Sequence, residues 1–118
     1  MKCLMLLPLL FMACSVDSSM LSGDWHAVGF YMNGQDVPAT LDSVKLSFTN
    51  SGDYTFKSIG FYEEKGSFRL AGKYLFLKDT TAKKPAEKAF QVLYLSEDTL
   101  KLGMESSGQE QTVFFSRN

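Results

Sequence analysis

Residues 44–57 read VKLSFTNSGDYTFK, a pattern in which apolar and polar residues alternate on both sides of a short polar segment. Val44 and Phe48 share one face of the first extended segment, and Tyr54 and Phe56 share one face of the second. Alternation with a period of two is typical of antiparallel strands, and Asn, Ser, Gly and Asp between two strands favour a tight turn. The stretch therefore predicts a β-hairpin with one apolar face.

The same alternation continues before and after this hairpin. It predicts eight strands, which cover residues 25–31, 44–48, 54–57, 61–70, 74–77, 89–95, 100–104 and 112–116. Gly66 interrupts the fourth strand, which indicates a bulge or a bend. Eight consecutive antiparallel strands predict an all-β fold, an up-and-down β-barrel, because closure removes the exposed sheet edges that promote aggregation.

The first fourteen residues have the composition of an export signal. Met1 and Lys2 precede an apolar run over residues 4–13. As a helix this run would be about 15 Å long, roughly half the thickness of a bilayer core, so it is too short to span a membrane. We therefore expect residues 1–13 to be an N-terminal signal helix, residues 14–22 a polar tether and residues 23–118 the barrel domain.

Cys14 follows the apolar run directly. The segment Phe11–Ser15 resembles the lipobox of bacterial lipoproteins, in which a small residue such as Ala13 precedes a cysteine that receives a diacylglycerol. The resemblance implies a lipoprotein of the cell envelope, anchored through Cys14 in the outer membrane or at its periplasmic face. Lipidation would also remove a thiol that is otherwise left unpaired after export. The alternative is cleavage after Ser15 by the ordinary signal peptidase, which would release a secreted soluble protein.

The charge of the chain excludes one class of partner. The formal net charge is −1, with 12 Lys and Arg residues against 13 Asp and Glu, so the basic surface that nucleic acids require is missing. The one dense basic stretch, residues 78–88, also contains acidic residues and a proline. We interpret its lysines, Lys88 among them, as a solvated loop that keeps the strand ends soluble.

The sequence offers no catalytic set. His26 is the single histidine, and both cysteines lie within the first fourteen residues. One histidine without a cysteine is too few for a Cys and His metal site, and no residues indicate a catalytic triad around it. The adjacent carboxylates of Glu63 and Glu64 would point to opposite faces of a strand, and Glu97 and Asp98 are typical of a turn. We expect no enzyme activity, no cofactor and no metal site.

The order of several short motifs resembles the lipocalin superfamily. Gly23-Asp24-Trp25 is similar to the Gly-x-Trp motif at the start of its first strand, and Arg117 matches the late arginine that stacks on this tryptophan. The segments 46–48, 52–54, 66–68, 75–77 and 95–102 resemble the lipocalin-like domains of small bacterial lipoproteins. The resemblance implies a barrel whose closed end is braced by Gly23, Trp25 and Arg117.

The resemblance also implies a function. It suggests a membrane-anchored, non-enzymatic protein that binds a small hydrophobic ligand, or an apolar segment of a partner protein, in the mouth of the barrel. Tyr54, Phe56, Phe76 and Tyr94 are the candidate ligand contacts, as aromatic residues expected to face inward. The same rings are bulky enough to fill an eight-stranded barrel. The alternative is a lipoprotein with a filled core that acts through its outer surface, as an accessory or inhibitor of an envelope protein.

Overall fold

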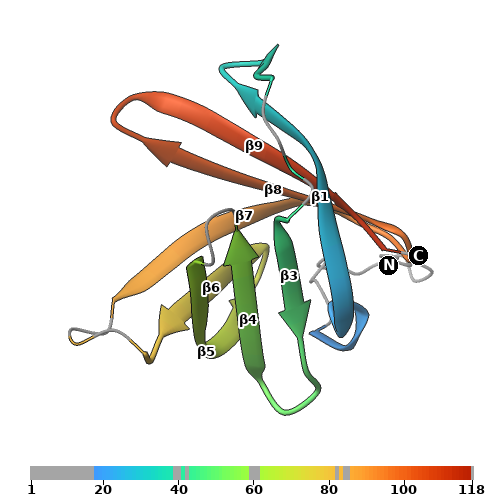
Figure 1. Ribbon diagram of the computed structural model, residues 1–118, viewed down its shortest axis with the longest axis vertical. Helices are drawn as coiled ribbons and strands as arrows, with labels where there is room; N and C mark the ends of the chain where they lie inside the picture. Colours follow the sequence, from blue (N-terminus) through green and yellow to red (C-terminus); the bar gives the residue numbers. More distant parts are fainter. Residues whose placement is uncertain are drawn as a thin grey trace, which may run out of the picture.

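The computed structural model describes residues 18–38, 41, 43–58, 62–81, 83 and 86–117, and this part of the chain is almost entirely β-structure (Figure 1). The elements in chain order are the 3-10 helix η1 (Ser18–Met20) and the strands β1 (Gly23–Met32), β2 (Gln35–Asp36), β3 (Lys45–Phe48), β4 (Asp53–Ser58), β5 (Tyr62–Ala71), β6 (Tyr74–Asp79), β7 (Glu87–Leu95), β8 (Thr99–Ser106) and β9 (Gln109–Ser116). No helix within these residues has the length and apolar character needed to cross a membrane. The expected signal helix and Cys14 lie outside the described residues.

Antiparallel pairing joins the strands into one sheet that closes on itself. The first half of β1 pairs with β3, and the opposite edge of β1 pairs with β9 from His26 to Met32. Figure 1 shows the result, with the long β8–β9 hairpin crossing the strands β3 to β6 at a steep angle. The expected eight-stranded antiparallel barrel is therefore confirmed, and β2 is a short addition that pairs with the end of β1.

The hairpin of residues 44–57 forms as expected. Leu46 lies opposite Phe56 and Phe48 lies opposite Tyr54, so their side chains share the inner face. The turn is closed by the amide of Thr49, which donates to the carbonyl oxygen of Asp53 at 2.9 Å. This register places the apolar residues of both strands in the barrel interior.

Two irregularities change which residues face inward. The register shifts between Ala27 and Gly29 in β1, and again between Val92 and Tyr94 in β7. Each shift inserts one residue into the alternation, so the side chains beyond it exchange faces. Bulges of this kind leave no periodic signal in the sequence.

Gly66 is not a third bulge, because β5 keeps a regular register with β4 on both sides of it and with β6 from Gly66 to Ala71. A Cβ atom at this position would lie 1.8 Å from the carbonyl oxygen of Lys78. No side chain fits there, and the glycine lets β6 approach β5 more closely than any other residue would allow. Of the two expectations for Gly66, the bulge is wrong.

The closed end of the barrel is packed around Trp25, which is fully buried. Its indole Nε1 donates a hydrogen bond to the carbonyl oxygen of Leu21 at 2.9 Å, and the side chain of Leu21 is also fully buried. Residues 18–22, expected to belong to a tether, are therefore part of the folded domain. The reason is physical, since an apolar leucine gains more from burial under the barrel than from a solvated linker.

Arg117 holds this end together. Its guanidinium carbon lies 4.0 Å from the centroid of the Trp25 ring, and its nitrogen atoms donate to the carbonyl oxygens of Glu97 at 2.9 Å, Met20 at 3.2 Å and Ser22. Gly23 has a φ of +123°, and a Cβ atom there would lie 3.2 Å from the guanidinium. One cation thus joins the segment before β1, the turn before β8 and the indole ring.

Replacing Arg117 with methionine should destabilise the domain by about 3 kcal/mol, because three backbone carbonyl groups and the indole ring lose their partner. Arg69→Met is the matched control, since Arg69 also stacks on an aromatic ring at 4.0 Å but is 58% exposed and pairs with an exposed glutamate. That change should cost less than about 1 kcal/mol. Urea denaturation measures both values, and equal losses would contradict the bracing role of Arg117.

Candidate functional site

The open end of the barrel contains a cavity of about 270 Å³. Its wall is mostly apolar and comes from several strands, with contributions from Phe30, Val44, Phe56, Phe90, Met104 and Val113. The volume lies near the lower limit of small-molecule pockets, which is about 300 Å³. The cavity has room for one small apolar molecule.

The other half of the interior is solid. Phe48, Tyr54, Leu75 and Leu100 are each at most 3% exposed and pack with Trp25 in one core. The sequence leaves open whether the barrel is filled or hollow. In the structure the closed end around Trp25 is filled and the open end is hollow. A completely filled core is therefore excluded for the described residues.

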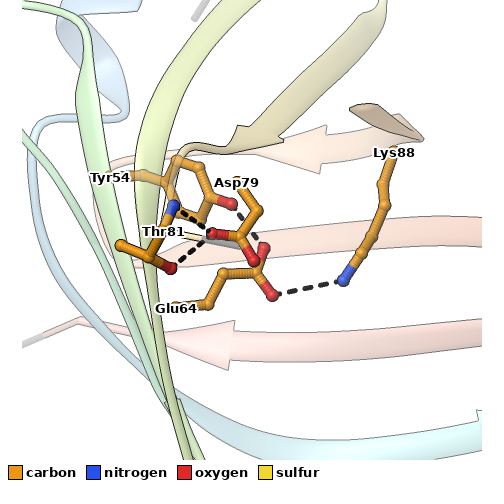
Figure 2. Close-up of polar contacts among 5 residues, drawn as sticks. All are labelled: Tyr54, Glu64, Asp79, Thr81 and Lys88. Carbon is orange, nitrogen blue, oxygen red and sulfur yellow. Dashed lines mark hydrogen bonds and ion pairs between the residues drawn. The ribbon is translucent and has the colours of Figure 1, made fainter. Parts of the chain in front are cut away.

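A polar cluster lies in the wall of the cavity. Among the described residues, Glu64 is the one charged side chain that is buried, at 3% exposure. Figure 2 shows Tyr54 and Lys88 approaching its carboxylate from two sides. The hydroxyl of Tyr54 donates to Oε2, and the ammonium of Lys88 donates to Oε1 at 3.3 Å. The cavity therefore has apolar walls and one fixed carboxylate.

The strands β4, β5 and β6 position this cluster. Tyr54, Gly66 and Asp79 are cross-strand partners in one row, so they share the inner face of the sheet. Gly66 has no side chain, and the carbonyl group of Lys78 occupies the place of its Cβ atom. Glu64 lies two residues earlier on β5, so its side chain points to the same inner face. Asp79 accepts hydrogen bonds from the backbone amide of Thr81 at 2.9 Å and from its hydroxyl at 2.6 Å.

Of the four aromatic residues expected to contact a ligand, the structure brings two to the interior. Phe56 lines the cavity, and Tyr54 is buried beside it with its hydroxyl on Glu64. Phe76 and Tyr94 lie on the outer face of the barrel. Phe76 is covered by the guanidinium of Arg69, and Tyr94 is 55% exposed.

Different causes put these two residues outside. In β7, Phe90 faces the cavity and Val92 is buried, but the bulge at Leu93 reverses the alternation and turns Tyr94 outward. In β6 every residue from 74 to 77 is apolar, so periodicity does not distinguish the two faces. The buried pair is Leu75 and Leu77.

Sequence reasoning missed Glu64 and Lys88. A signal for Glu64 was present, because it lies two residues before Gly66 and four before Phe68, on the inward face of the predicted strand. Lys88 was assigned to a solvated loop, but it lies in β7 and its ammonium reaches the inner carboxylate. Nothing in the sequence indicates that β7 places this lysine opposite Glu64.

The remaining candidate residues lie on the outside. His26 lies on the outer face with Lys45, Ser47 and Thr55, in a shallow polar groove. Glu97 and Asp98 form the turn before β8, where the hydroxyl of Ser96 donates to Asp98. Within the described ranges, no three His, Cys, Asp or Glu side chains gather closely enough to hold a metal ion.

Comparison with known proteins identifies the fold. A lipocalin-like protein from Bacteroides uniformis has a TM-score of 0.64 and 22% identity, covering 84% of this chain and 99% of its own. An uncharacterized protein from Bacteroides eggerthii has a TM-score of 0.63 and 14% identity, covering 82% and 99%. Insecticyanin from the tobacco hornworm Manduca sexta has a TM-score of 0.60 and 10% identity, covering 86% and 64%. No family model and no curated protein sequence matches this chain.

Removing the Tyr54 hydroxyl should destabilise the domain by about 2 kcal/mol, because the buried carboxylate of Glu64 loses a hydrogen bond made to a charged group. Tyr94→Phe is the control, since this tyrosine is exposed on the outer face and its change should cost less than about 0.5 kcal/mol. Chemical denaturation of Y54F and Y94F gives both values. A Y54F variant as stable as the parent would show that the bond contributes nothing to folding.

Proposed function

We propose that this lipocalin-like barrel is a non-enzymatic binding protein that takes one small apolar molecule in the cavity at its open end. The observation that supports the proposal is the cavity itself, which has about 270 Å³ of space and a mostly apolar wall. Unfilled apolar space forgoes the dispersion contacts that a packed core would make. A ligand in this cavity would make the dispersion contacts that the unfilled space lacks, while the packed end keeps the barrel folded.

The size and wall of the cavity favour a small molecule over a segment of a partner protein. Phe30, Phe56 and Phe90 supply flat apolar surface, and polar groups are few. Pockets of this kind obtain affinity from apolar burial and orientation from a small number of polar groups.

The alternative function, interaction through the outer surface, has weaker support. Phe76 is covered by Arg69 at 4.0 Å, and the ammonium of Lys101 lies 5.0 Å from the centroid of Phe114. Val28, Tyr74, Leu93 and Tyr94 remain as exposed large apolar residues, on strands β1, β6 and β7. Much of the apolar outer wall that motivated this alternative is therefore covered within the monomer.

We also propose that the protein is a lipoprotein of the cell envelope. This part of the proposal rests on the sequence, in which an apolar run and Ala13 precede Cys14. A diacylglycerol on Cys14 would hold the barrel close to a membrane, since two acyl chains give stable attachment. The cavity would then be presented at the membrane surface or in the space beside it.

Binding of 1-octanol, followed by chemical-shift changes in two-dimensional NMR, tests the cavity. The parent should bind, and Val113→Trp should abolish binding because the indole ring occupies the cavity. Val28→Trp is the matched control, because Val28 is 61% exposed and its replacement leaves the cavity unchanged. A parent that does not bind, or a V113W variant that binds as well as the parent, would contradict the proposal.

Mass spectrometry of the protein expressed in a bacterial host tests the anchor. The mature chain should begin at Cys14 and carry acyl groups, and Cys14→Ser should abolish the modification. Cys3→Ser is the control, because Cys3 lies within the expected signal and its change should leave the modification intact. An unmodified mature chain that begins at Val16 would instead establish the secreted alternative.

A further inference from the structure

We propose that the cavity selects an apolar amine, whose ammonium group takes the place of the Lys88 ammonium on the carboxylate of Glu64. This inference rests on the proposed binding function and adds the chemical class of the ligand. It is carried by the different surroundings of the two charges in the cavity wall.

The negative charge is held in the interior. Glu64 is 3% exposed, and its partner Tyr54, which donates to Oε2, is 2% exposed. Both come from neighbouring strands, β4 and β5, which pair in regular register at this point. The carboxylate is therefore held by the sheet with almost none of its surface in water, and a buried carboxylate requires a compensating partner.

The positive charge is not held in this way. The side chain of Lys88 is 49% exposed, and it joins the carboxylate by one contact of 3.3 Å between Nζ and Oε1. A lysine has a long flexible stem and a strongly hydrated ammonium, so Lys88 can move into water when another cation takes its place on Glu64. The cluster thus consists of a fixed anion and an exchangeable cation.

Asp79 is a second carboxylate near Glu64, but it does not line the cavity. Asp79 lies on the inner face of β6, diagonal to Glu64 across the two paired strands, and it accepts hydrogen bonds from Thr81 (Figure 2). Among the described residues that line the cavity, Glu64 and Lys88 are the charged ones, so a ligand meets the carboxylate of Glu64 when Lys88 moves away. A ligand carboxylate would be repelled there, whereas a ligand ammonium would restore the ion pair.

The apolar wall requires the rest of the ligand to be hydrocarbon. An amine with a short alkyl or aromatic body buries that body against Phe56 and Phe90 while its ammonium reaches Glu64, since all three residues line the same cavity. An alcohol of the same length would gain the apolar contacts without the ion pair. The two classes should therefore differ in affinity by the value of one charge-assisted hydrogen bond.

Three probes with the same eight-carbon body test this selection: octylamine, 1-octanol and octanoate, titrated into the full chain by two-dimensional NMR. The parent should bind octylamine about tenfold more tightly than 1-octanol. Glu64→Gln should remove this preference while binding of 1-octanol persists. Lys88→Met should strengthen octylamine binding by about threefold or more, because the competing ammonium is gone.

Lys78→Met is the matched control, because Lys78 is an exposed lysine at the end of β6 and its change should leave all three affinities unaltered. The comparison of amine and alcohol in the parent, together with K88M, remains decisive even if E64Q does not fold. Equal affinities for octylamine and 1-octanol would overturn the amine selection and leave the proposed binding function standing. Octanoate as the tightest ligand, with its binding lost in K88M, would also overturn it. Failure of all three probes to bind would instead contradict the binding function itself.

Discussion

The structure depends on one constraint, the pairing of β1 with β3 along one edge and with β9 along the other. This double pairing closes the sheet and gives every strand an inner and an outer face. It also brings Arg117, which follows β9, next to Gly23, where β1 begins. Arg117 can therefore reach the backbone of η1 and the ring of Trp25. The contacts of Arg117 at the closed end are thus a direct consequence of barrel closure.

The closed interior is divided between packing and space. At one end Trp25, Phe48 and Leu100 form a solid core, and at the other end the wall encloses a cavity. Tyr54 belongs to both parts, because its ring is buried in the core and its hydroxyl binds Glu64. The packed half thus supplies the rigid donor that allows a carboxylate to remain in an apolar interior. The packed core at the closed end therefore holds the Tyr54 hydroxyl in position for the Glu64 carboxylate in the cavity wall.

The fold was largely predictable because its signal is local. Alternation over residues 44–57 and the turn residues between strands indicate a meander, and the observed strands follow it with small changes at their ends. The site was less predictable. Phe56 was found by alternation, whereas the bulge at Leu93 reversed Tyr94, and β6 is apolar on both faces, so Phe76 was placed on the wrong side. Glu64 was missed although its position relative to Gly66 indicated an inward face.

The strand order and the up-and-down barrel follow from the sequence, because period and turn chemistry act between near neighbours in the chain. The stacking of Arg117 on Trp25 was implied by the resemblance to lipocalins, and the structure contains it. The cavity in one half of the barrel and the contact of Lys88 on β7 with Glu64 on β5 arise only when the strands pack together. Cavity volume depends on how side chains from every strand fill a common space, and the ion pair of Glu64 with Lys88 depends on the registers of β5 with β6 and of β6 with β7. Neither quantity is contained in any single segment.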